Sequence, residues 1–169
     1  YGGSCFPKDT LALAHTARDV GSPLKIIETV VQINNKRKIN MANRVIAACN
    51  GTLTDKTIAV LGVTFKPNTN DMRDSPSLEI IPALQKAGAS IRAYDPEGMD
   101  EAKGMLKAVN WCENSYDAMK GADALVIITE WNAFRGLDFE RVKTLLKKPV
   151  LVDLRNIYNP DDMETAGIN

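Results

Sequence analysis

The stretch TIAVLGV, residues 57–63, is a short run of apolar and β-branched side chains with a glycine near its end. A run of this length between polar segments predicts a strand that is buried on both faces of a sheet. A second strand is predicted at residues 90–94, closed by Asp95-Pro96, and similar apolar runs follow at 124–129 and 149–154. Between them the pattern predicts helices at 77–87, with a kink at Pro82, and at 139–147. This alternation predicts an α/β fold with a Rossmann-like parallel sheet, whose ligands bind at the carboxyl ends of the strands.

The first 50 residues predict helices rather than strands. A short helix over 8–20 would end at Gly21, the usual glycine position after a helix. Ser22 as N-cap and Pro23 as the first helical residue predict a long helix over 23–50, about 40 Å at 1.5 Å per residue. We therefore divide the chain into residues 1–50, which contain this long central helix, and the sheet domain at 51–169.

The role of the long helix stays open at this point. Its first half carries a broad apolar face, which would suit a link between domains or a homodimer interface. An ordinary amphipathic helix lying on its own core explains the same periodicity. We expect its basic run, Lys36, Arg37 and Lys38, to be a solvated face.

Composition excludes several classes of protein. Lysine plus arginine (21) balances aspartate plus glutamate (21), so no global charge favours nucleic acid or an anionic membrane surface. Three distant cysteines and one histidine fit neither a disulfide framework nor a metal site. No apolar run reaches the roughly 18 residues of a membrane span. These features favour a cytoplasmic protein that binds a small molecule.

The first segment with chemical potential is Tyr1-Gly2-Gly3-Ser4-Cys5-Phe6-Pro7-Lys8-Asp9. Its two glycines allow close approach of a ligand to the backbone, although a plain turn needs them equally. Cys5 offers a soft nucleophile, and Lys8 and Asp9 can adjust the charge around it. A lone cysteine is otherwise most often a small buried apolar residue.

The second segment is the loop after the first strand, GVTFKPNTNDMRDSP at residues 62–76. It lacks the GxGxxG pattern of a dinucleotide-binding turn. Lys66 can supply a point charge for a diphosphate and Arg73 a planar fork for a phosphate. Asp71 and Ser75 are expected to hold the loop and the helix start that follows. Arg155, at the end of the last predicted strand, is either an anion ligand or part of a surface salt bridge.

GGSCFPKD and the GxxFKPxTxDxRxSP pattern of this loop resemble the signatures of the UDP-glucose/GDP-mannose dehydrogenase family. The resemblance implies an NAD-dependent oxidation of the C6 alcohol of a nucleotide sugar to a carboxylate. Cys5 would capture the intermediate aldehyde as a thiohemiacetal, which is oxidised to a thioester and then hydrolysed.

The resemblance also implies roles for other residues. Asp9 would position or activate the hydrolytic water, although an acidic residue also suits the start of a helix. Lys8 and Arg73 would lie on the NAD side. The substrate-binding residues would be Tyr1, Gly2, Gly3, Phe65, Lys66 and Arg155.

The resemblance implies UDP-glucose as substrate and UDP-glucuronate as product, with GDP-mannose or another nucleotide sugar as the alternative. The family's NAD-binding domain would lie outside this chain, so we expect the chain by itself to be inactive. A different class of function, a non-catalytic module for nucleotide binding and dimerisation, is the competing interpretation.

Overall fold

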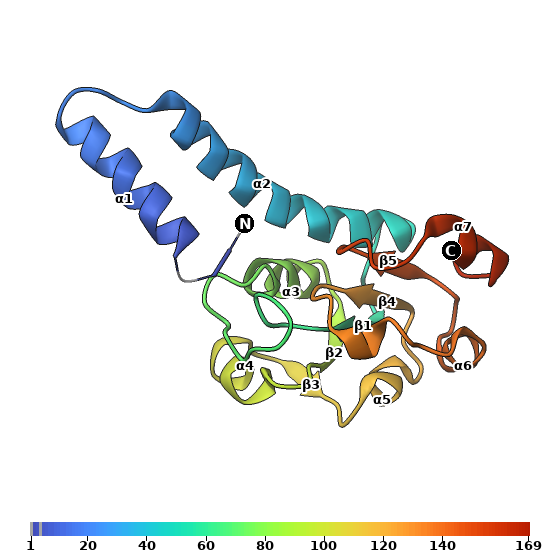
Figure 1. Cartoon of the computed structure of the whole chain (residues 1–169). Coiled ribbons are helices and arrows are strands. Elements are labelled where there is room, and N and C mark those ends of the chain that lie inside the picture. The colour runs from blue at the N-terminus through green and yellow to red at the C-terminus, as the bar shows by residue number, and fades with distance from the viewer. Residues whose placement is uncertain (1, 4) are drawn as a thin grey trace.

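The computed structural model describes residues 2, 3 and 5–169, and its centre is one parallel sheet (Figure 1). The strands are β1 (Thr57–Leu61), β2 (Ser90–Tyr94), β3 (Val109–Trp111), β4 (Ala124–Ile127) and β5 (Leu151–Asp153). Their order is β3-β2-β1-β4-β5, and every neighbouring pair is parallel. The predicted α/β fold with a parallel sheet is therefore confirmed. The sequence analysis missed β3, an edge strand of three residues with polar Asn110 at its centre.

The helices cover both faces of this sheet. They are α1 (Phe6–Asp19), α2 (Lys25–Ala48), α3 (Ser77–Lys86), α4 (Met99–Met105), α5 (Ser115–Met119), α6 (Phe139–Leu145) and α7 (Pro160–Thr165), with a 3-10 turn, η1, at Asn132–Phe134. Successive side chains of β1 point to opposite faces, as in any strand. Ile58 and Val60 pack with α2 and α3, whereas Ala59 and Leu61 pack with α5 and α6.

The start of α2 differs from the prediction. The helix begins at Lys25, and Leu24 occupies the N-cap position without a side-chain hydrogen bond. Ser22 ends the preceding helix instead, because its amide donates to the Ala17 carbonyl at 2.8 Å while Gly21 has a φ of 71°. This is the hydrogen-bond pattern that closes a helix C-terminus, so the chain turns before a new helix can begin.

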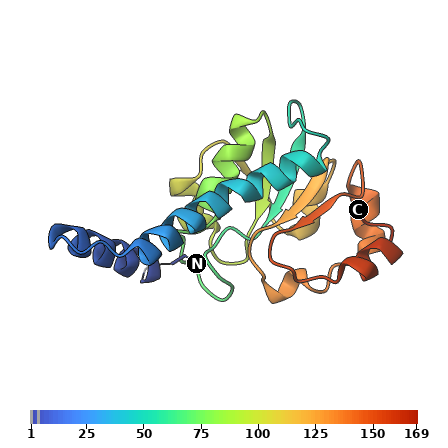
Figure 2. The same ribbon diagram turned by 90° about the horizontal axis from the view of Figure 1, so that it is seen from above.

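The two halves of the long helix lie in different surroundings. Its C-terminal half lies on the sheet domain, where Ala42 and Val45 are fully buried in the core shared with α3. Its N-terminal half projects beyond the sheet and pairs with α1 as a helical hairpin (Figures 1 and 2). There Ile26 and Ile33 are 79% and 62% exposed, so this half leaves an apolar face uncovered.

The strand order creates a crevice at one place in the sheet. After β1 the chain builds β2 and β3 on one side, and it then crosses over to place β4 and β5 on the other. Between β1 and β4 the connections therefore run in opposite directions. In open α/β sheets, ligands bind beside the carboxyl ends of the strands at this point.

Candidate functional site

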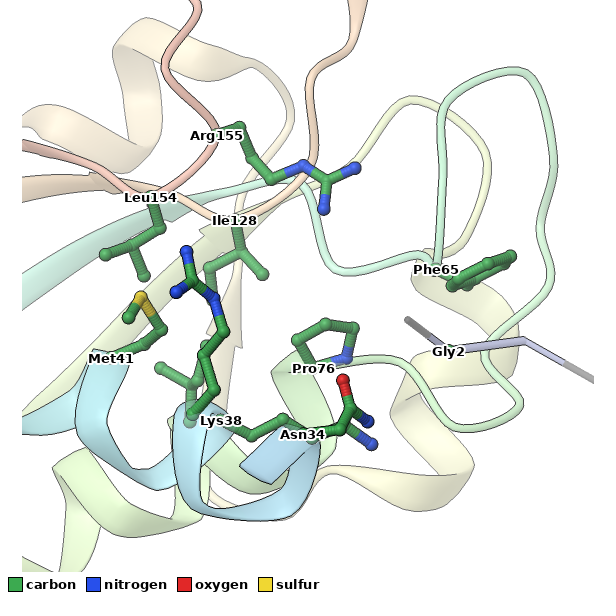
Figure 3. Close-up of a pocket in the computed structure, with 11 residues that line it drawn as sticks. Gly2, Asn34, Lys38, Met41, Phe65, Pro76, Ile128, Leu154 and Arg155 are labelled. Atoms are coloured by element: carbon green, nitrogen blue, oxygen red, sulfur yellow. The ribbon is translucent and has the colours of Figure 1, made fainter. Parts of the chain in front are cut away.

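A pocket lies at this crevice, between the carboxyl ends of the strands and the side of α2 (Figure 3). Its walls come from five parts of the chain that are distant in sequence. The lining residues are Gly2, Asn34, Arg37, Lys38, Met41, Phe65, Pro76, Ile80, Ile128, Leu154 and Arg155. Three predicted substrate-binding residues, Gly2, Phe65 and Arg155, are thus brought together.

The cysteine segment packs directly on the loop that follows β1. Gly2 and Gly3 are buried, and a Cβ built on Gly2 would stand 2.8 Å from the Asp74 carbonyl oxygen. A Cβ on Gly3, whose φ is 82°, would stand 2.5 Å from the Phe65 ring. Both glycines are therefore required by the contact between the two motifs, whatever else approaches them.

Two side chains, Asp95 and Ser75, fix the backbone around Phe65 through hydrogen bonds. The fully buried Asp95 accepts from the amides of Val63 at 2.7 Å and Thr64 at 3.2 Å, and from the Trp131 indole at 3.1 Å. Ser75 donates to the Val63 carbonyl at 2.7 Å, which supports its expected structural role. One carboxylate thus joins the ends of β1, β2 and β4.

Arg155 enters the pocket in partnership with Glu130. Its Nε and Nη2 donate to the two carboxylate oxygens of Glu130 at 2.5 and 2.6 Å. Burial alone would raise the pKa of Glu130, but the hydrogen bonds and charge of Arg155 outweigh it and hold that pKa below its usual range. Arg155 therefore forms the salt bridge that was considered for it and also lines the pocket, while its role as an anion ligand stays a prediction.

The basic run of α2 is not simply a solvated face, and that expectation was wrong. The side chain of Lys38 is 10% exposed and donates to Asp74 at 3.1 Å. Arg37 is exposed but lines the pocket. Asn34, Lys38 and Met41 share this helix face because they are spaced by four and three residues. That spacing was present in the sequence, but periodicity alone did not show which partner the face would meet.

Two models of one family match the chain. The model described as "UDP-glucose/GDP-mannose dehydrogenase family, UDP binding domain" matches residues 59–160. The model of the central domain of the same family matches residues 1–36. The chain belongs to the UDP-glucose/GDP-mannose dehydrogenase family.

Individual proteins of this family align along nearly the whole chain. UDP-glucose 6-dehydrogenase of Rhizobium meliloti (strain 1021) is 54% identical over 99% of the chain, and TuaD, a UDP-glucose 6-dehydrogenase of Bacillus subtilis (strain 168), is 44% identical over 99%. The chain spans 38% and 36% of the length of these relatives. The structure of a UDP-glucose dehydrogenase from Pyrobaculum islandicum superposes with a TM-score of 0.81 at 32% identity, covering 93% of this chain and 35% of that one.

Of the family's cysteine motif, Gly2 lines the pocket, whereas Cys5, Lys8 and Asp9 lie beside it. Cys5 is exposed immediately before α1, and its carbonyl accepts from the Asp9 amide at 2.9 Å. Lys8 and Asp9 are exposed on the first turn of α1, 3.8 Å apart at their charged atoms. Tyr1 lies outside the described residues. The other two cysteines, Cys49 and Cys112, are buried, and burial raises the pKa of each thiol.

The two cationic residues of the family's second motif also stay outside the pocket lining. Lys66 is exposed. Arg73 forms a two-pronged ion pair with Asp71, with both nitrogen–oxygen distances at 2.9 Å. The hydrogen bond and charge of Asp71 raise the pKa of Arg73, and proximity to Cys5 makes a smaller contribution in the same direction. Arg73 therefore lies on the cysteine side of the loop, and Asp71 has the structural role expected for it.

At residues 2, 3 and 5–169, no three His, Cys, Asp or Glu side chains gather in a way that could bind a metal ion. No helix within these residues is both long and apolar enough to cross a bilayer.

Proposed function

We propose that this chain is the catalytic-cysteine and nucleotide-binding part of an NAD-dependent UDP-glucose 6-dehydrogenase. The observation that carries the proposal is the packing of the cysteine segment onto Phe65, which places Gly2 in the wall of the pocket at the sheet crevice. The names of the relatives support UDP-glucose as the sugar nucleotide. A pocket with apolar walls and few polar groups is typical of small-molecule sites.

The substrate would lie with its nucleotide in the pocket and its sugar over Gly2 and Gly3, toward Cys5. Phe65 would pack against the ligand, and Lys66 and Arg155 would contact its phosphate region. Tyr1 would contact the same substrate. This orientation follows from the order of the residues, since Gly2 lines the pocket and Cys5 lies three positions further along the chain, in the open.

In the proposed reaction, two NAD+ molecules bound one after the other would each accept one hydride, so that together they supply the two oxidations. The first converts the C6 alcohol to an aldehyde and releases a proton. The Cys5 thiol then adds to the aldehyde carbon while its proton passes to the aldehyde oxygen, and loss of the second hydride from the carbon and of the proton from the oxygen leaves a thioester. Water, held or activated by Asp9, displaces the sulfur and yields UDP-glucuronate and the free thiol.

The residues present fit only one side of the NAD molecule. The turn after β1 is filled by Phe65 and by the hydrogen bonds of Asp95, so it offers no glycine-rich loop for a dinucleotide. The exposed cations Lys8 and Arg73 lie near Cys5 and suit contacts close to the reacting end of the cofactor. The remainder of the cofactor site would be formed by residues outside this chain.

The uncovered apolar face of the α1–α2 hairpin supports a homodimer. Residues 1–50 would carry the cysteine and the dimer interface, and residues 51–169 would bind the UDP half of the substrate. Analytical ultracentrifugation of Ile26→Asp beside the unmodified chain tests this arrangement. Because the Ile26 side chain is 79% exposed, a charge there should dissociate a dimer without disturbing the core. A cytoplasmic location fits three cysteines that form no disulfide among residues 2, 3 and 5–169.

Alkylation of Cys5 tests the proposed site in the chain itself. Iodoacetamide should modify Cys5 selectively under native conditions, because Cys49 and Cys112 are buried. UDP-glucose should slow this modification more strongly than GDP-mannose, and the Lys66→Ala, Arg155→Ala double variant should lose the protection. Equal rates with and without UDP-glucose would contradict the proposed site, and stronger protection by GDP-mannose would change the substrate.

A further inference from the structure

Three cationic side chains line the pocket, and two of them already have an anionic partner. Lys38 is paired with Asp74 at 3.1 Å, and Arg155 is paired with Glu130 through two hydrogen bonds. Each pair is close to neutral as a unit. Neither pair therefore supplies the net positive charge that an anionic ligand needs.

Arg37 is different from both. Among residues 2, 3 and 5–169, its guanidinium forms no ion pair and no hydrogen bond. It lies one residue before the buried Lys38. With Asn34 and Met41 it lines the pocket from α2. The unpaired charge of the pocket lining is thus concentrated on Arg37. A guanidinium with its donors unused is well suited to bind a phosphate through two hydrogen bonds.

The rest of the pocket is apolar and suits the base and ribose of a nucleotide. The remaining wall is apolar, formed by Met41, Pro76, Ile80, Ile128 and Leu154. Figure 3 shows Arg155 on the opposite side of the pocket from Lys38 and Asn34, with Phe65 and Gly2 at one end. An apolar wall can cover a base and ribose, while the charged rim meets the phosphates.

We infer that Arg37 is the principal anchor for the phosphates of the ligand in this pocket. This inference rests on the proposed function and adds to it a residue of α2 that neither signature motif contains. Arg155, neutralised by Glu130, then acts as an orienting hydrogen-bond donor rather than as the main source of charge.

Calorimetric titration of the 169-residue chain with UDP and with uridine tests the role of Arg37. The variant is Arg37→Gln, and the matched control is Lys36→Gln, which removes the same charge from the neighbouring position outside the pocket lining. Arg37→Gln should weaken UDP about tenfold or more, the order expected for a lost charge-assisted hydrogen bond. Lys36→Gln should weaken UDP by less than about threefold, because an exposed charge is largely screened by salt.

The uridine titration separates a charge effect from damage to the pocket. Uridine has no phosphate, so Arg37→Gln should leave its affinity unchanged, and Arg37→Lys should restore part of the UDP affinity. Equal UDP affinity in Arg37→Gln and the unmodified chain would overturn this inference and leave the proposed function intact. Equal losses for UDP and uridine would also overturn it. No binding of UDP by the unmodified chain would overturn both proposals.

Discussion

The ring of Phe65 lies so close to the backbone of Gly3 that a Cβ on Gly3 would be 2.5 Å from the ring atom Cε1. Gly3 also has a φ of 82°, a conformation that L side chains rarely adopt. One residue of the cysteine segment is thus held by one residue of the signature loop. The position of Cys5 depends on this contact, because only Ser4 separates Gly3 from Cys5 in the sequence.

Gly3→Ala should therefore destabilise the chain by both strain and overlap. The left-handed backbone costs roughly 1–2 kcal/mol for a residue with a Cβ, and overpacking against Phe65 adds about 1–3 kcal/mol. Gly21→Ala is the matched control, since Gly21 has a φ of 71° with nothing within 4 Å. Urea denaturation should show a larger loss for Gly3→Ala. Equal losses for the two variants would mean that the Phe65 contact contributes nothing.

Asp95→Ala should be among the most destabilising single substitutions in the sheet domain. The buried carboxylate accepts hydrogen bonds from Val63, Thr64, Glu97, Gly98 and Trp131. Its removal leaves several buried donors without a partner, each at a cost of about 1–3 kcal/mol. We expect a loss above about 3 kcal/mol by urea denaturation. Asp100→Ala, which removes an exposed pair with Lys103, should cost less than about 1 kcal/mol, and similar losses in both would contradict this role of Asp95.

Most of the sheet could be predicted because β1, β4 and β5 lie in apolar runs of the sequence, and β2 alternates between buried and more exposed side chains. Edge strand β3 could not, because it is short and only one side of it needs apolar neighbours. Of the pocket, Phe65 and Arg155 could be located in advance, since residues that follow parallel strands gather at one edge. Ser22 was wrongly predicted to be the N-cap of α2, because the C-terminus of α1 and the start of α2 lie within a few residues of each other and Ser22 belongs to the first.

The contribution of α2 to the pocket could not be predicted for a physical reason. A lysine in a polar run is normally solvated, and its burial depends on a carboxylate supplied from far away in sequence. Lys38 forms an ion pair with Asp74, which lies 36 positions further along the chain. Asp74 belongs to a loop whose shape depends on Asp95. Such a partner is visible only once the fold has brought α2 onto the sheet.

Tyr158 should make the stability of the chain fall at high pH. Burial raises the pKa of its phenol to about 12, and the hydroxyl donates to the Phe134 carbonyl. In the unfolded chain this pKa is about 10. Below pH 10 both states keep the proton and the contribution is complete, whereas between about 10 and 12 only the folded state keeps it. Stability then falls with rising pH, by at most about 1.4 kcal/mol per pH unit and by less for a partly exposed ring.

Urea denaturation at pH 9 and pH 11, with Tyr158→Phe as the comparison, measures this effect. The stability advantage of the unmodified chain over Tyr158→Phe should shrink between the two pH values. Other groups that titrate in this range affect both proteins equally and cancel in the difference. A difference that stays constant would show that the phenol titrates alike in the folded and unfolded chains.

Glu130→Gln should tighten the binding of UDP. At neutral pH Glu130 is ionised, because the bonds and charge of Arg155 hold its pKa low despite its partial burial. Replacing it with glutamine removes one negative charge beside the phosphate region and leaves one oxygen to hold Arg155 in place. The net charge of the pocket lining therefore rises, and we expect an affinity gain of about threefold at low ionic strength that declines with added salt.

Glu140→Gln is the control for this substitution, because Glu140 is an exposed residue of α6 paired only with Lys143. It removes the same charge from the chain without changing the pocket, so its UDP affinity should match that of the unmodified protein. Weaker UDP binding in Glu130→Gln would contradict the charge argument. The carboxylate would then matter chiefly because its two hydrogen bonds hold the Arg155 guanidinium in one orientation, and Arg155 rather than Arg37 would be the dominant contact with the phosphate.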